Sequence, residues 1–228
     1  MYHARVQSET PPFLVKALFH VHTRASRDCT LSAEKLIQRC LDEGVDVVAI
    51  TDHGTIAGAL EVRQRAPFQV IVGEEIETLE GGEIIGLFLR ELIPDGRTAR
   101  TVITAIRSQG GLTYLPHPFD LLRKTRWSRA QREMLLREAD IVETFNARTL
   151  FSGANAQAAA AAKNLSKVPC AGADAHFSTE IGRTVVYLTP CQTPGELMNS
   201  LRTATFQVRR SPLWARPASG LTRIIRRS

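Results

Sequence analysis

The 228-residue sequence predicts an α/β fold in which a parallel sheet closes, or nearly closes, into a barrel. Two observations predict this fold class. Apolar, β-branched runs alternate with segments of helical periodicity about seven times along the chain, and no low-complexity linker interrupts them. Five of the six histidines also fall at or just beyond the ends of expected strands, where a parallel barrel gathers its functional side chains.

The first half of the chain supplies four of the expected strands. They cover residues 16–22, 45–54, 69–77 and 82–90. A helix is expected over residues 32–44, because apolar residues recur there at helical spacing, Ser32 can cap its start and Gly44 can end it. A shorter helix is expected over residues 58–66, before the third strand.

The second half continues the alternation. Its expected strands cover residues 111–118, 140–146, 168–176 and 183–190, and its expected helices cover residues 99–110, 129–139, 153–165 and 194–204. Glycine closes the first of these helices, and proline halts the strand that ends at residue 118. We therefore expect one domain over residues 1–208.

Composition is ordinary for a soluble protein, with 43% apolar and 23% charged residues. No apolar run approaches the ~20 residues that span a bilayer, and the first residues lack the apolar core of a signal peptide. A cytoplasmic location without membrane contact is the expectation. The four scattered cysteines indicate reduced thiols, not a disulfide framework: Cys29, Cys40, Cys170 and Cys191.

The net charge of +6 arises in the last segment of the chain. Residues 209–228 contain six arginines and no acidic residue, whereas the remainder carries 23 basic and 23 acidic side chains. We treat residues 209–228 as a basic, arginine-rich tail. Such a tail can contact nucleic acid or an anionic membrane surface, or it can be a solvated chain end.

The spacing of the histidines indicates a metal centre. His20 and His22 stand one residue apart, and residues i and i+2 of an extended strand point to the same face. Further nitrogen and oxygen ligands follow other expected strands, in numbers beyond the three or four that one ion needs. Two or three divalent ions sharing carboxylates are expected, and Mn²⁺, Zn²⁺ and Fe²⁺ all suit such ligands.

The motifs "HVH", "SRDCTLS", "AITDHG", "VGEEIE", "LPHP" and "GADAH" occur in this order between residues 20 and 176. In this order the chain resembles the PHP (polymerase and histidinol phosphatase) superfamily over roughly residues 16–190, and specifically its stand-alone phosphoesterases. The resemblance implies a distorted (β/α)7 barrel, with a trinuclear metal site at the carboxyl ends of the strands that catalyses phosphoester hydrolysis.

The resemblance also implies the metal ligands, residue by residue. They form three groups: His20, His22, Glu75 and Asp174 for the first ion; Glu75 and His117 for the second; Asp28, His53 and His176 for the third. Glu83 stands where many relatives have a histidine, and it is a candidate ligand of the second ion or a surface residue. Asp52 is expected to orient a ligand, and Glu74 to point to the opposite face of its strand.

The expected chemistry is attack on phosphorus by a metal-activated hydroxide, without a protein nucleophile. Glu75 and Asp174 are the expected catalytic ligands, and His176 is a candidate proton donor to the leaving oxygen. Arginine binds two phosphate oxygens at once, and three arginines near expected strand ends are candidates for this contact: Arg24, Arg148 and Arg183. Glu143 and Asn146 also resemble the family pattern.

The substrate is expected to be a phosphorylated small molecule, a nucleotide or a short RNA, with the basic tail as a possible nucleic-acid contact. Two alternatives stay open. One is a monoesterase of the histidinol-phosphate type, and the other is a metal-stabilised binding module without catalysis. The sequence does not distinguish monoester from diester substrates, and it gives no indication of the oligomeric state.

Overall fold

The computed structural model describes residues 13–123 and 127–225, and the basic tail is described as far as residue 225. Within these residues nine strands form one sheet in the order β7-β6-β5-β4-β3-β2-β1-β8-β9. The strands are β1 (Val15–Val21), β2 (Val47–Ile50), β3 (Gln69–Glu77), β4 (Glu83–Leu87), β5 (Leu112–Leu115), β6 (Ile141–Asn146), β7 (Val168–Gly172), β8 (Val185–Leu188) and β9 (Thr205–Gln207).

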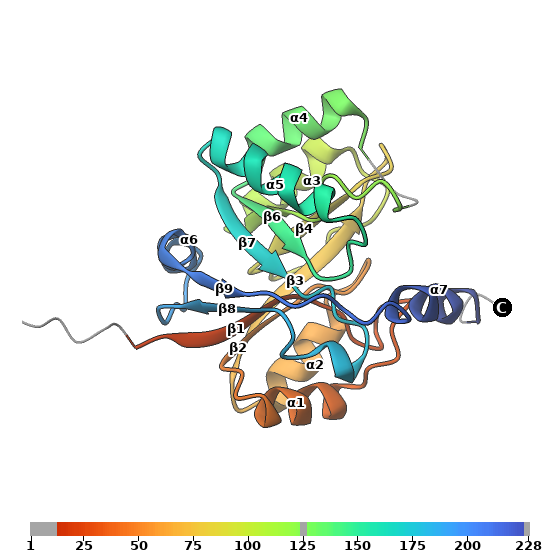
Figure 1. Cartoon of the computed structure of the whole chain (residues 1–228), viewed down its shortest axis with the longest axis vertical. Helices are drawn as coiled ribbons and strands as arrows, with labels where there is room; N and C mark the ends of the chain where they lie inside the picture. The colour runs from red at the N-terminus through yellow and green to blue at the C-terminus, as the bar shows by residue number, and fades with distance from the viewer. Residues whose placement is uncertain (1–12, 124–126, 226–228) are drawn as a thin grey trace, which may run out of the picture.

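Seven helices surround this sheet within the described residues (Figure 1). They are α1 (Ala33–Asp42), α2 (Ala57–Arg65), α3 (Ala99–Ser108), α4 (Arg129–Glu138), α5 (Ser152–Asn164), α6 (Pro194–Thr203) and α7 (Ala215–Ile225), with a 3-10 turn at Ser178–Glu180. Over the part of the chain that is described, no helix is long and apolar enough to cross a membrane.

The two halves of β1 pair with different partners, and this change closes the barrel. Residues 15–17 pair antiparallel with β8. Further along, Ala173 N donates to Phe19 O at 2.9 Å and His22 N donates to Ala175 O at 2.9 Å, which joins β1 to the chain that follows β7. The predicted α/β barrel is therefore confirmed, with β8 and β9 continuing the sheet beyond the point of closure.

The sheet departs from the expected parallel arrangement at two strands, β4 and β8, which run opposite to the others. β4 runs antiparallel to both β3 and β5, and β8 and β9 are also antiparallel to their neighbours. A short turn can join antiparallel strands, whereas a parallel connection needs a crossover of a dozen or more residues. Only residues 78–82 separate β3 from β4, so β4 must reverse direction, and its first residue lies beside the last residue of β3.

Two apolar cores hold the barrel together. Inside it, alternate strand residues such as Ala17, Phe19 and Ile71 pack with Leu197 and Leu201 of α6. Because these α6 residues share the cluster with the first residues of β1, β2 and β7, α6 covers the amino ends of the strands. The outer core lies between the strands and α1 to α5, and the carboxyl ends remain available for a site.

We predict that Gly73→Ala destabilises the barrel, because Gly73 lies in β3 where the neighbouring backbones approach closely. An added Cβ would stand 2.7 Å from the carbonyl oxygen of Gly86 and 3.1 Å from that of Ile50. We expect a loss of about 1–3 kcal/mol in the free energy of unfolding, measured by urea denaturation. The control is Gly195→Ala in α6, where nothing lies within 4 Å of the added atom. Equal stability of the two variants would contradict the packing described.

Candidate metal centre

A bulge in β1 brings His20 and His22 to the same site. Ala17 and Phe19 face the barrel interior, while Leu18 and Val21 belong to the outer core. A regular strand would therefore turn His20 outward with Leu18. Instead the register shifts between Leu18 and Val21, and His20 takes a left-handed backbone with φ of 61°. The two imidazole centroids lie 5.2 Å apart, so the convergence was predicted correctly but arises from an irregular strand.

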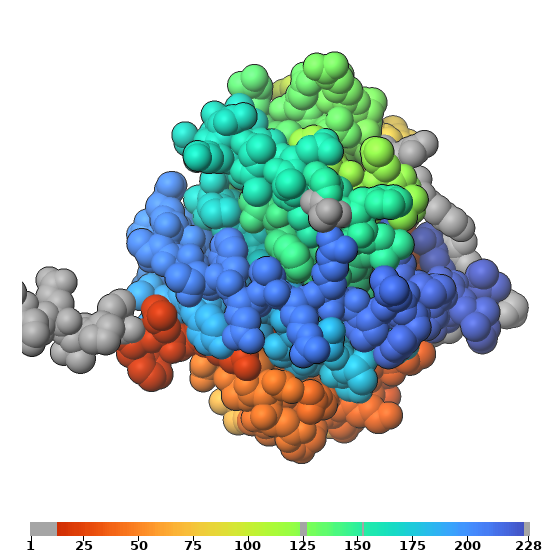
Figure 2. All heavy atoms as spheres, in the orientation of Figure 1, coloured from red at the N-terminus to blue at the C-terminus, as the bar shows by residue number. Residues whose placement is uncertain are grey.

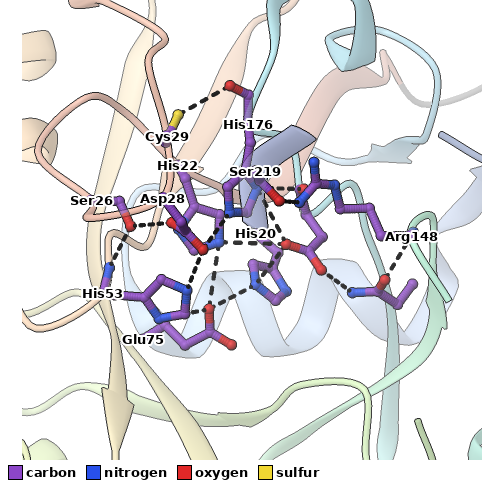
Figure 3. Close-up of polar contacts among 12 residues, drawn as sticks. His20, His22, Ser26, Asp28, Cys29, His53, Glu75, Arg148, His176 and Ser219 are labelled. Carbon is purple, nitrogen blue, oxygen red and sulfur yellow. Dashed lines mark hydrogen bonds and ion pairs between the residues drawn. The ribbon is translucent and has the colours of Figure 1, made fainter. Parts of the chain in front are cut away.

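Glu75 is fully buried, and contacts from several side chains of the cluster converge on its carboxylate (Figure 3). It points inward from β3 with Ile71, because both have the same alternation parity. Four imidazoles approach its carboxylate oxygens: His117 at 3.1 Å, His20 at 3.2 Å, and His22 and His53 both at 3.4 Å. The carboxylate of Glu75 is thus placed to bind more than one ion, as the family resemblance implies.

A second group gathers around Asp28, which lies in the loop after β1. Its Oδ2 is 3.3 Å from His176 Nε2 and 3.5 Å from His53 Nε2. His22 completes this group: one ligand atom from each of the four residues lies within 4.8 Å of the other three. Three further groups satisfy the same limit: His20, Glu75 and His117; His20, His22 and Asp174; His53, Glu75 and Glu83.

Glu83 joins the cluster because β4 runs antiparallel. As the first residue of β4, it lies at the mouth of the barrel, 3.7 Å from His117 and 3.8 Å from His53. It is buried, with 6% of its surface exposed, and does not have the solvated position of a surface strand residue. All nine side chains that the sequence suggested as ligands therefore lie in one cluster.

The donor atoms fit bound cations. Among the described residues, several buried ligand atoms have no hydrogen-bond partner: both ring nitrogens of His22, Nδ1 of His53, Oε2 of Glu83 and Oδ1 of Asp174. Leaving such atoms unpaired is costly in a folded interior. Nitrogen and carboxylate donors of this kind suit divalent ions, which would give partners to the carboxylate oxygens and to one ring nitrogen of each histidine.

Electrostatics leads to the same conclusion. Burial and the nearby charge of Glu75 raise the pKa of Glu83. Burial and the neighbouring His176 lower the pKa of His22 to about 3, whereas His20 has a raised pKa because the carboxylates of Glu75, Glu143 and Asp174 outweigh its burial. Each carboxylate thus disfavours the charge of its carboxylate neighbours, and each imidazole that of its imidazole neighbours. Divalent cations would relieve the repulsion between the carboxylates.

Glu143 orients two of the ligands. Its Oε1 accepts hydrogen bonds from His20 Nδ1 at 2.8 Å and from the Tyr114 hydroxyl at 2.9 Å. Its Oε2 accepts from the backbone N–H of His117 at 2.7 Å and from Asn146 Nδ2 at 2.9 Å. Bonding at Nδ1 leaves Nε2 of His20 available toward Glu75, as in metal sites whose outer carboxylate fixes the histidine tautomer.

The two other carboxylates considered earlier lie outside the ligand set. Asp52 accepts hydrogen bonds from the backbone and hydroxyl of Thr23, at 2.5 and 2.7 Å, and so fixes the loop after His22. Glu74 points away from the barrel interior and accepts from Ile93 N at 2.9 Å. Burial raises the pKa of Glu74 to about 7.

A cavity of about 480 Å³ opens beside the cluster and exposes Asp28, His53, Glu83 and His176 to it. Its other lining residues include four arginines, Arg123, Arg148, Arg216 and Arg223. The candidates Arg24 and Arg183 are not among the described lining residues. Arg24 contacts Glu61 on the surface, and Arg183 donates to the carbonyl oxygen of Arg210.

Arg123 is the site residue that sequence reasoning missed. It lies after β5 and forms an ion pair with Asp174, a candidate ligand, and a second one with Asp120 at 3.5 Å. It belongs to none of the motifs quoted above, and only the tertiary structure brings it to the mouth. Arg148, a candidate for phosphate binding, lines the same cavity. Its guanidinium donates to Glu180, to Ser219 and to the Ala215 carbonyl, and its contact with phosphate stays a prediction.

The fold and the cluster define a class of metal-binding α/β barrels with the site at the carboxyl ends of the strands. Within this class, the family model described as PHP domain matches residues 19–142, and the one described as PHP-associated matches residues 152–206. The chain belongs to the PHP domain family, which confirms the resemblance inferred from its motifs.

One relative in sequence and two solved structures with a similar fold show what the chain resembles. The uncharacterized protein MJ0417 of Methanocaldococcus jannaschii is 32% identical over 84% of this chain and 81% of its own. A two-domain protein from Bacteroides vulgatus containing a predicted PHP-like metal-dependent phosphoesterase superposes with a TM-score of 0.71 at 16% identity, over 87% of this chain and 66% of its own. The lesion-specific endonuclease PfuEndoQ from Pyrococcus furiosus gives 0.59 at 11% identity, over 85% of this chain and 58% of its own.

We predict that Glu143→Gln weakens Mn²⁺ binding about 10–100-fold, the usual cost of losing an outer-shell partner. Each carboxylate oxygen of Glu143 accepts two hydrogen bonds, so the amide group of glutamine would face two donors whichever way it turned. Calorimetric titration measures the affinity. The control is Glu74→Gln, which changes a buried carboxylate on the outward face of β3 and should bind Mn²⁺ like the unmodified protein. An unchanged Mn²⁺ affinity of Glu143→Gln would contradict the role assigned to Glu143.

Proposed function

We propose that the protein is a metal-dependent hydrolase of phosphate esters. The observation that carries the proposal is that the ligand cluster lines the same cavity as several arginines. The cluster contains buried ligand atoms without a hydrogen-bond partner, which a metal ion can use, and the arginines can bind phosphate oxygens. Bound divalent ions would activate water for attack on phosphorus and neutralise the phosphoryl oxygens. Two or three ions fit the four overlapping groups of ligands, with Mn²⁺, Zn²⁺ or Fe²⁺ as candidates.

The residues of the chain divide the remaining work. Glu75 in β3 and Asp174 in the chain after β7 would hold the ions, and Asn146 Nδ2, which donates to Asp174 Oδ2 at 3.1 Å, keeps that carboxylate oriented. Arg123 stands beside Asp174 on the cavity wall, where a phosphate oxygen can reach its guanidinium. His176 lines the cavity and is the candidate that protonates the leaving oxygen.

A nucleotide or the end of a short RNA is the substrate we favour. The cavity volume lies in the range of sites that enclose ligands of this size. The likeness of the barrel to PfuEndoQ, an endonuclease, is compatible with a nucleic-acid substrate but establishes the fold alone. A histidinol-phosphate-type monoesterase and a metal-stabilised binding module without catalysis are the alternatives that the assay below separates.

We predict that the Mn²⁺-loaded protein hydrolyses an aryl phosphate ester and that Glu75→Gln lowers kcat/KM at least about 100-fold, because the central ligand of the cluster is weakened. Comparing the monoester with the diester identifies the class: monoester turnover alone indicates a nucleotide or metabolite phosphatase, and diester turnover a nuclease. The matched control is Glu74→Gln, the adjacent residue on the other face of β3. Absence of turnover of both esters by a folded, metal-loaded sample would support the binding module.

A further inference from the structure

The C-terminal segment, interpreted from sequence as a basic tail, contains helix α7, whose residues line the cavity beside the cluster. Figure 2 shows this end of the chain, in dark blue, packed against the body of the protein. The helix packs on the barrel through its small residues, because Ala215 and Ser219 are buried while Leu221 and Ile224 of the same helix are exposed. The chain that leads into it is also fixed, since Ser211 N donates to Ala147 O at 2.9 Å and the Trp214 ring contacts Phe177 edge to face at 5.2 Å.

One charged connection links α7 to the loop of His176. The Arg148 guanidinium donates to Ser219 Oγ at 3.0 Å and to the Ala215 carbonyl at 2.8 Å. The same guanidinium donates to Glu180 at 2.9 Å, and the other oxygen of Glu180 accepts from His176 N at 2.8 Å. Arg148 and Glu180 are buried, so these hydrogen bonds are shielded from competing water.

A second charged connection reaches Asp174. Arg216 of α7 pairs with Asp120 at 3.1 Å, Asp120 pairs with Arg123, and Arg123 pairs with Asp174. Asp120 is 5% exposed. The helix is therefore attached to two loops that carry candidate metal ligands. These buried charged contacts, and not only packing on the surface, hold α7 beside the cluster.

Half of the residues that line the cavity come from α7. They present two cations, Arg216 and Arg223, and an aliphatic surface formed by Leu221 and Ile224. Leu122, in the loop after β5, adds an aliphatic contact beside Arg123. A ligand whose phosphate lies on the metal cluster would place the rest of its body against α7.

We propose that α7 is the specificity wall of the site: it binds the anionic and apolar body beyond the reacting phosphate, and it restricts the site to small esters and chain ends. A phosphodiester inside a continuous polymer needs room for chain on both sides of the reacting phosphorus, and α7 occupies space next to the cluster. This inference rests on the proposed function, since it assumes that the cavity receives a phosphate ester. This role differs from that of a free basic tail that binds nucleic acid by charge alone. Here α7 contacts the ligand from a fixed position on the barrel.

The test compares equilibrium binding of a dye-labelled, 5′-phosphorylated linear oligonucleotide with that of the same sequence ligated into a circle. Both forms are made with hydrolysis-resistant phosphorothioate groups, because the Mn²⁺-loaded protein is proposed to hydrolyse phosphate esters. We expect the full chain, loaded with Mn²⁺, to bind the linear form at least about tenfold more tightly. Arg216→Gln combined with Ser219→Ala loosens both connections and should reduce this preference. Arg202→Gln removes the same charge from an exposed position in α6 and should leave the preference unchanged.

A second variant tests the wall without loosening the helix. Gly220 lies in α7 on the cavity lining, and a Cβ added there meets nothing within 4 Å. We expect Gly220→Trp to weaken binding of the linear oligonucleotide about tenfold, whereas Gly195→Trp, at an equally open position in α6, should bind normally.

Equal binding of circle and linear form by the full chain, or equal binding by Gly220→Trp and Gly195→Trp, would overturn the proposal for α7. Aryl phosphate turnover is measured on the same samples and separates the two hypotheses. Turnover without any effect of α7 would refute the wall and retain the hydrolase. An α7-dependent preference without turnover of any ester would refute hydrolysis and retain the wall.

Discussion

The burial of the Glu75 carboxylate is the constraint on which the rest of the structure depends. A carboxylate removed from water must be compensated, and Glu75 is fully buried with four imidazoles within 3.4 Å. Imidazoles that are neutral supply little compensation, and protonated ones would repel one another. Divalent cations would compensate the buried carboxylate and leave the imidazoles neutral. The candidate ligands that would hold these cations come from separate segments of the chain and meet at Glu75. The barrel can be understood as the scaffold that holds those segments together.

Backbone strain shows how closely the scaffold serves the cluster. His20, His117 and Asp174 all have positive φ angles, of 61°, 28° and 48°, which side chains other than glycine rarely adopt. Such strain persists only where the surrounding structure holds it, and it concentrates at functional sites. Three features hold these residues in place: the hydrogen bonds between β1 and the chain after β7, the two apolar cores, and the hydrogen bonds of Glu143.

The motifs and the resemblance they carry predicted which side chains gather in the cluster, and apolar periodicity predicted most elements, because both are local signals. Prediction from sequence failed where tertiary structure decides. The reversal of β4 follows from a short connection, Arg123 reaches Asp174 only in the folded chain, and the bulge at His20 replaces the regular strand from which its direction was argued. Arginine-rich composition concealed α7, although the spacing of Ala215 and Ser219 by one helical turn was a usable signal for a buried helix face.

The most direct test of the account is a crystal structure of the protein grown with Mn²⁺, with anomalous diffraction used to locate the ions. We expect two or three anomalous peaks inside the cluster, one of them within coordination distance of Glu75 and one within the group formed by Asp28, His53 and His176. A structure with the same barrel at saturating Mn²⁺, in which no peak lies among these residues and the ligand atoms are satisfied by water alone, would contradict the central claim.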